Sequence, residues 1–187
     1  MLKVYAGSLL LVIVLIVCSL GRFNPASRVI DSRWIAQENS SVESDTAAIF
    51  AAIQQKDFGI VQSMLPLEVT SAESDRNYYD RYQEILNDLA SDSVRIPQIV
   101  VAANAEFYQS RQHDWVVVPT EAVVAYSDGQ VLQRGFLLGV RSKDKTAWNY
   151  LDFTINWQHS RQFVELLFPD FPKNIPLPEC TATYHDP

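Results

Sequence analysis

The stretch "DWVVVPTEAVVAYSDGQVLQRGFLLGVRSKDK", residues 114–145, decides the fold class of this chain. Its β-branched and aromatic residues recur with a period of two, which is typical of half-buried strands. The "SDGQ" in its middle predicts a tight hairpin turn, and the charged "SKDK" at its end predicts another. Pro119 predicts a bulge or an edge, while Gly135 and Gly139 predict sharp curvature. The stretch therefore predicts the centre of a curved antiparallel meander.

Two further runs extend the meander, "QIVVAANAEFYQS" at residues 98–110 and "KTAWNYLDFTIN" at residues 145–156. Upstream, "DTAAIFAAIQQKDFGIVQSMLP" predicts a helix capped by Asp45, an interruption at "KDFG" and a second helix that Pro66 ends. A third amphipathic helix is predicted in "SDRNYYDRYQEILNDLASD". Because a curved antiparallel sheet needs helices on its concave face, the sequence predicts an α+β fold.

The end of the chain, "SRQFVELLFPDFPKNIPLPEC", predicts a short amphipathic helix followed by a proline-rich tail. The predicted apolar side of this helix consists of Phe163, Leu166 and Leu167. In the tail, prolines alternate with Phe168, Phe171, Ile175 and Leu177. This alternation predicts a tail that packs against the domain.

The start of the chain, "MLKVYAGSLLLVIVLIVCSLG", is a leader of different composition. It is apolar over residues 4–20, about 17 residues, which is the lower limit for a helix that spans a bilayer. A cleaved signal peptide and an uncleaved signal anchor both fit. Lipidation at Cys18 is a third interpretation, although Val17 stands where such a site needs Gly, Ala or Ser. In each case residues 1–21 direct the chain to a membrane.

Residues 22–44 are mixed and polar, and they are predicted to link the leader to a domain at residues 45–187. Arginines follow the apolar run, with only Lys3 before it, so the positive-inside rule opposes an external body. A short leader with one lysine before a long globular domain is nevertheless typical of an export signal. We expect a membrane-anchored or exported chain with a periplasmic body.

The composition and the cysteine positions argue against a nucleic-acid partner and against a disulfide in the body. The chain has 187 residues, 48% of them hydrophobic and 20% charged, which suits one globular domain with a real core. Its formal net charge is −7, whereas nucleic-acid binding selects for clustered Lys and Arg, so no nucleic-acid partner is expected. Cys18 in the leader and Cys180 in the tail are not expected to meet, so no disulfide is predicted in the body.

The order of these elements resembles the nuclear-transport-factor-2-like superfamily, also called the cystatin-like α+β cone. The phrase "AIQQKDFGIVQSMLP" resembles its first helix pair, and "WNYLDFT" resembles its aromatic-rich last strands, so the resemblance covers residues 45–158. The tail "LLFPDFPKNIPLPE" resembles the ends of bacterial members. The superfamily includes isomerases, dehydratases and polyketide cyclases, and also non-catalytic domains that bind partners or small ligands. Catalytic members use a carboxylate or a His in the cone, with Tyr or Asp as an oxyanion partner.

Asp152 is the carboxylate that fits this chemistry, because it shares strand parity with Trp148 and Tyr150. If that face lines a pocket, Asp152 would be a base beside Tyr150, and Trp148 would contact the ligand. The alternative, which we favour, is an Asp near a strand end that is solvated or hydrogen-bonded to a loop. Acidic residues are seldom buried unless they are paired.

The remaining polar residues predict neither a metal nor a cofactor. Glu106 and Glu121 lie mid-strand and are expected on the solvent side of the sheet. The histidines at 113, 159 and 185 do not cluster, and the chain has no phosphate-binding glycine loop and no serine nucleophile elbow. Trp34 is expected either at the bilayer surface or docked on the domain, whereas Trp115, Trp148 and Trp157 are expected to pack in the core.

The sequence therefore favours a non-catalytic envelope domain that binds a protein partner or a small apolar ligand. One alternative is an isomerase or cyclase that uses Asp152 with Tyr150. Another is an assembly subunit that dimerises through its sheet.

Overall fold

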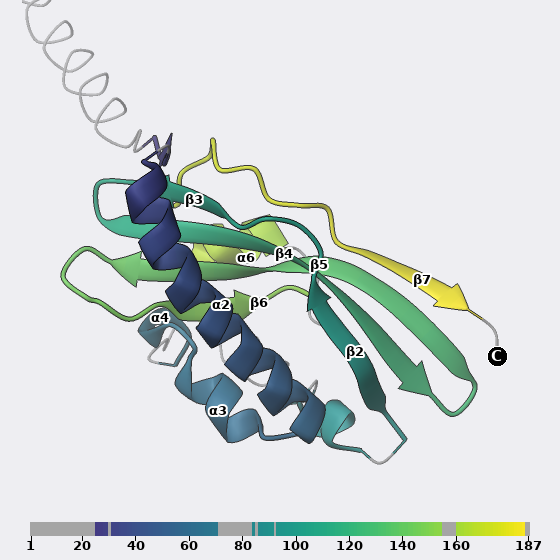
Figure 1. The fold of residues 1–187 in the computed structure, drawn as a ribbon. Coiled ribbons are helices and arrows are strands. Elements are labelled where there is room, and N and C mark those ends of the chain that lie inside the picture. Colours follow the sequence, from purple (N-terminus) through teal and green to yellow (C-terminus); the bar gives the residue numbers. More distant parts are fainter. Residues whose placement is uncertain are drawn as a thin grey trace, which may run out of the picture.

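The computed structural model describes residues 25–29, 31–70, 84, 86–91, 93–154 and 160–185 (Figure 1). The predicted α+β class is confirmed, because seven strands within these described ranges form one antiparallel sheet flanked by helices. The predicted leader lies outside the described residues, as do Trp157, His159 and most of the third predicted helix. Among the helices that the structure describes, none combines the length and the apolar character needed to cross a membrane.

Two long strands form the centre of the sheet, and each is flanked by shorter strands that follow one another in line. The central pair is β4 (His113–Tyr126) and β5 (Gly129–Ser142), joined at the predicted "SDGQ" turn. Along β4 run β2 (Arg95–Val101) and β3 (Glu106–Gln109), and β3 also pairs with β1 (Ser27–Arg28). Along β5 run β6 (Asn149–Asp152) and β7 (Thr181–His185). The strand predicted at 98–110 is thus two strands, and β6 is shorter than the strand predicted at 145–156.

Pro119 accounts for the interruption between β2 and β3. It lies opposite Phe136, and β4 and β5 stay in register through it, so it forms no bulge with β5. Its carbonyl accepts a hydrogen bond from Ala102 N–H at 2.8 Å, just beyond the end of β2. The N–H that proline lacks would point to this same side, where the chain has left the sheet. At Pro119, β4 therefore lacks a paired strand on the side of β2 and β3, as the sequence predicts, but stays paired with β5 on the other side.

The main helix, α2 (Ser32–Gln55), begins earlier than the sequence predicts. Its N-cap is Asp31, whose carboxylate accepts from the backbone N–H groups of the first turn at 2.9 and 3.2 Å. The predicted cap, Asp45, lies in mid-helix, so the predicted linker is wrong from Ser32 onward. The polar residues before Asp45 show no period of their own, and contacts across the sheet stabilise their helical form instead.

The break predicted at "KDFG" is confirmed. Lys56 ends α2 in the left-handed conformation, with φ 59°, and its N–H bonds back to the last turn. Two short helices follow, α3 (Phe58–Ser63) and α4 (Leu67–Thr70).

Helices cover both faces of the sheet (Figure 1). On one side, here called the α2 face, α2 and α3 pack on residues such as Val116 and Leu137. On the other, here called the tail face, α6 (Ser160–Leu167) and the tail pack on residues such as Trp115 and Phe136. Neighbouring residues of β4 and β5 thus serve opposite cores, as strand alternation requires.

The predicted packing of the tail is confirmed, because Phe168, Phe171 and Ile175 are all buried on the tail face. The apolar side of α6 needs one correction. Leu166 is 53% exposed, while Val164 is fully buried. The buried side of α6 therefore includes Val164, which the sequence did not place there, and excludes Leu166.

Candidate functional site

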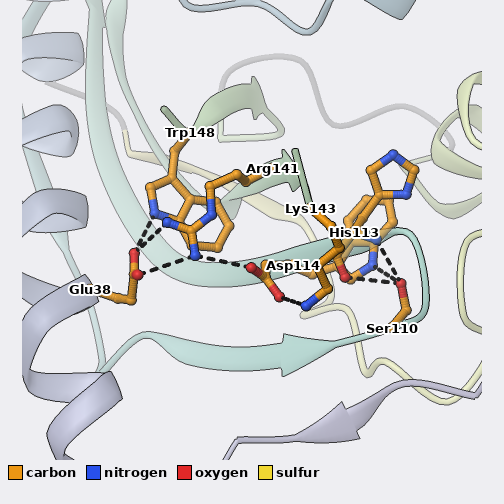
Figure 2. A network of polar contacts seen from close by, with 8 residues as sticks. Glu38, Ser110, His113, Asp114, Arg141, Lys143 and Trp148 are labelled. Carbon is orange, nitrogen blue, oxygen red and sulfur yellow. Dashed lines mark hydrogen bonds and ion pairs between the residues drawn. The ribbon is translucent and has the colours of Figure 1, made fainter. Parts of the chain in front are cut away.

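A chain of buried charges joins α2 to the ends of β4 and β5 (Figure 2). Glu38 of α2 accepts hydrogen bonds from both terminal nitrogens of Arg141, at 2.8 and 3.1 Å. The same guanidinium donates to Asp114 Oδ2 at 3.0 Å, and Asp114 also binds Lys143 Nζ. Glu38 and Asp114 are only 8% and 6% exposed. Two carboxylates and the Arg141 guanidinium thus lie where little water reaches, and the exposed Lys143 balances the remaining charge.

Arg141 is the centre of this network. Burial opposes its charged form, but its contacts with Glu38 and Asp114 raise its pKa overall. Its guanidinium also lies 4.4 Å from the ring centroid of Trp148, whose indole N–H donates to Glu38 at 3.1 Å. Trp148 is therefore buried inside the network that fixes α2 on the sheet, which agrees with the core packing expected for it and not with the alternative of a ligand contact.

Trp34 lies in the first turn of α2 and docks on the domain, which is the second of its two predicted placements. Its ring meets Phe107 edge to face, with centroids 5.5 Å apart. Arg141 lies 5.9 Å from the same ring. Aromatic and charged contacts therefore hold the N-terminal half of α2, whereas its C-terminal half buries Ile49, Phe50 and Ile53.

The structure places Tyr150 and Asp152 on the α2 face, as their parity predicts, but gives them different partners. The Tyr150 hydroxyl donates to Asp45 of α2 at 3.0 Å, and burial, with the Asp45 charge, raises the pKa of Tyr150. Asp152 Oδ1 accepts from the backbone N–H of Thr154 at 2.7 Å. The space beside the two side chains is about 10 Å³, roughly the room that one water needs. These hydrogen bonds position α2 and the end of β6.

Ser110, His113 and Asp170 bring together the residue types of a hydrolytic triad without its geometry. Ser110 Oγ bonds to the His113 carbonyl at 3.0 Å and to the Trp115 indole at 3.2 Å. The imidazole is turned away from Ser110 (Figure 2) and lies between Trp115 and Phe168, with Nδ1 3.7 Å from Asp170 Oδ2. A triad needs an imidazole nitrogen at the hydroxyl. The cluster instead ties the start of β4 to the tail.

The two glutamates predicted in mid-strand lie at partly exposed positions and form ion pairs, Glu106 at the start of β3 and Glu121 within β4. Glu106 bonds to Arg28 at 2.7 Å and accepts from the Tyr108 hydroxyl at 2.5 Å. Burial, together with Glu106, raises the pKa of Tyr108 to about 12. Glu121 pairs with Arg134 at 2.7 Å. Within the described ranges, no group of three or more His, Cys, Asp or Glu side chains is placed to hold a metal ion.

A groove of about 670 Å³ lies between the N-terminal half of α2 and residues 102–105, which connect β2 to β3. Its walls combine small apolar side chains such as Ala36 and Val118 with polar ones such as Asn39 and Glu43. This volume falls within the range of roughly 300–1,000 Å³ that is common for small-molecule sites. The groove exists because α2 begins at Ser32 and because the chain leaves the sheet after β2.

Thr46 contributes an unpaired polar group to this groove. The residue is 2% exposed, and its hydroxyl has no hydrogen-bond partner among the residues that the structure describes. Leaving a buried hydroxyl unpaired costs about 1–3 kcal/mol. Sequence reasoning missed the site, although one signal was present: Thr46 interrupts the apolar stripe of Val42, Ile49 and Ile53 on α2.

Comparison with protein-family models, with curated proteins and with solved structures finds no match to this chain. The observed architecture, α+β with a curved antiparallel sheet, is compatible with the cone superfamily. Function therefore has to be argued from the geometry of the site itself.

Proposed function

We propose that this chain is a non-catalytic envelope domain that binds a small molecule in the groove beside α2. One observation carries the proposal: Thr46, whose buried hydroxyl lacks a partner among the described residues, lines a groove in which apolar side chains such as Ala36 stand beside polar ones such as Asn39. A ligand with both apolar and hydrogen-bonding groups would fill such a groove, and one of its polar groups would pair with Thr46. The envelope location rests on the apolar run at residues 4–20.

The surroundings of Asp152 and Tyr150, the catalytic candidates of the alternative interpretation, support a non-catalytic role. A base of the isomerase type must reach a proton on a bound substrate. The space at Asp152 and Tyr150 is about 10 Å³, whereas the groove offers about 670 Å³. Tyr150 and Asp152 are also engaged by Asp45 and by the backbone of Thr154. Room for a ligand and candidate catalytic groups thus lie in different places.

Kinship with the cone superfamily, through a bacterial member, belongs to the same proposal. The helix pair α2 and α3 contains the "AIQQKDFGIVQSML" phrase and lies on one face of the curved sheet (Figure 1). Non-catalytic members of that superfamily bind small ligands or partners, which fits a groove that lies beside the long helix.

The test is to extract the full chain from membranes in polymer-bounded lipid discs and to identify the small molecules that co-purify by mass spectrometry. Ala36→Trp, which fills the groove, should abolish retention of a molecule that wild type retains. Ala51→Trp is the matched control, because Ala51 is an exposed alanine of the same helix that does not line the groove. Equal retention by both variants would contradict the proposal.

Thr46→Val sharpens the test, because valine keeps the shape of threonine and removes only the hydroxyl. Retention of the ligand should fall about tenfold, as expected for a lost hydrogen bond of about 1.4 kcal/mol. The midpoint of thermal unfolding should stay the same or rise, since an unpaired buried hydroxyl is removed. A variant that loses stability but keeps its ligand would show that Thr46 is a structural residue.

A further inference from the structure

The sheet has four outer strands, and three of them carry visible protection against pairing with another chain. Unprotected edges invite pairing, and natural proteins block them with short strands, proline, charge, bulges or covering segments. The strand β1 has only two residues, and its Arg28 is ion-paired with Glu106 at 2.7 Å. The strand β2 contains Pro97 and shifts register between Arg95 and Gln98.

The protection of β6 comes from the end of α3. Tyr150 N–H, on the outer side of β6, donates to the carbonyl of Met64 at 2.8 Å. Asn149 Nδ2 donates to the neighbouring carbonyl of Leu65 at 3.2 Å. This edge is therefore occupied by the polypeptide that follows α3.

Among the residues that the structure describes, the fourth edge, β7, has none of these devices. It runs along the first half of β5 at the outer side of the molecule (Figure 1), and its five residues are all exposed. Its sequence, "TATYH", contains no proline, lysine, arginine or carboxylate and consists mainly of residues that favour strands. Among the described strands it pairs with β5 alone. Its outer backbone groups form a template for one more strand.

The side chains of β7 are complementary to a second copy of the same strand. In an antiparallel pair about a two-fold axis at Thr183, that residue lies opposite itself, and Thr–Thr pairs are favourable. Ala182 then lies opposite Tyr184, a small side chain beside a large one, and Thr181 lies opposite His185. Pro178 lacks an N–H and limits such pairing on the N-terminal side. This register places no two like charges opposite each other.

We propose that β7 is a homodimer edge, at which a second copy of this chain adds its own β7 antiparallel about Thr183. The two seven-stranded sheets then continue as one. The surface is distinct from the groove beside α2, so either proposal can fail without the other. Such self-pairing is isologous and closes at two chains, because each chain offers one β7 edge.

The experiment measures the mass of the full chain by sedimentation equilibrium, in a detergent matched to the solvent density, from micromolar to near-millimolar protein. Wild type should show a monomer–dimer equilibrium. Thr183→Lys places two cations on the axis and should raise the dissociation constant roughly tenfold. Thr146→Lys is the matched control, an exposed threonine between β5 and β6 with the same change of charge, and it should dimerise as wild type does.

A variant of opposite charge keeps the test decisive if lysine disturbs β7 itself. The Thr183→Glu chain alone should also dimerise more weakly than wild type. An equimolar mixture of Thr183→Glu and Thr183→Lys chains should recover wild-type association, because unlike charges then face each other. A wild-type chain that stays monomeric over the whole concentration range would overturn the proposal, even if β7 can bind a strand of another protein. Unchanged association of Thr183→Lys, or no recovery in the mixture, would overturn it equally.

Discussion

The two faces of the sheet are covered in different ways. On the tail face, aromatic rings contact one another directly. The ring centroids of Trp115 and Phe171 are 4.9 Å apart, and so are those of Phe136 and Phe153. On the α2 face, the N-terminal half of the covering helix reaches the sheet through a buried carboxylate, Glu38, and borders an open groove. One face is held by packed rings, and the other combines packing with charge.

This difference suggests that one face mainly stabilises the fold and the other mainly positions α2. Buried rings contribute through the apolar area that they remove from water, and edge-to-face contacts add to that contribution. A buried ion pair adds little over apolar residues of similar volume, yet breaking it is costly, so it acts mainly to hold one geometry. We therefore expect the tail face to carry most of the stability, and the α2 face to fix the helix that forms the groove wall.

The largest effect is expected on the tail face. Phe136 is fully buried there against Phe153. Phe136→Ala should lower the free energy of unfolding by about 3–5 kcal/mol, because it loses apolar burial and leaves a cavity. Urea unfolding followed by tryptophan fluorescence measures this loss. Leu166→Ala is the control on α6: Leu166 is 53% exposed, so its loss should stay within about 0.5 kcal/mol. Similar losses for both variants would contradict a sealed tail face.

The next effect concerns the charges under α2. Glu38→Gln keeps the shape of the side chain but removes its charge from a guanidinium 2.8 Å away. The free energy of unfolding should fall by about 2–3 kcal/mol, the range for hydrogen bonds to charged groups. A double-mutant cycle with Arg141→Gln, measured by urea unfolding, should give a coupling energy of about 1–3 kcal/mol.

The exposed pair Glu121 and Arg134 is a matched control for that cycle, because its contact distance of 2.7 Å is nearly the same. Its side chains are 32% and 59% exposed, against 11% for each partner of the buried pair. The coupling energy of the exposed pair should be about 0.2–1 kcal/mol. If the two cycles gave equal coupling energies, burial would not be what makes the Glu38 contact matter.

The sequence predicts the sheet and the tail better than it predicts α2. The hairpin at "SDGQ", the break at "KDFG" and the packed tail are all confirmed, because each depends on local turn chemistry or on a strong apolar period. The start of α2 was missed, since the cap at Asp31 is followed by polar residues without a helical period. Those residues are helical because Glu38 and Trp34 find partners more than 70 residues away along the chain.

The site was predictable only in part, for the same reason. Strand parity placed Trp148, Tyr150 and Asp152 on one face correctly. Parity could not show that α2 would cover that face and supply Asp45 and Glu38 as partners. The groove depends on the position of α2 and on the gap between β2 and β3. Pro119 is a local sign of that gap, and the polar Thr46 in an apolar stripe is a second local sign, whereas the position of α2 depends on long-range contacts.

The last prediction concerns a property that the two faces should share. Each face buries one tyrosine hydroxyl against a carboxylate: Tyr108 bonds to Glu106 on the tail face, and Tyr150 bonds to Asp45 on the α2 face. Burial raises both pKa values, that of Tyr108 to about 12. An unfolded tyrosine loses its proton near pH 10, so above that pH the folded chain binds more protons, and stability falls as pH rises.

For Tyr108 the free energy of unfolding should fall between pH 10 and pH 12, and Tyr108 should leave it unchanged below pH 10. Urea unfolding of the full chain at half-unit steps from pH 8 to pH 12 measures the slope. Lysines also titrate in this window, but they do so equally in every variant, so the difference from wild type isolates each tyrosine. Tyr108→Phe and Tyr150→Phe should each remove part of the alkaline slope. If only one of them did, the face whose variant left the slope unchanged would be the one that excludes water less well from its tyrosine hydroxyl.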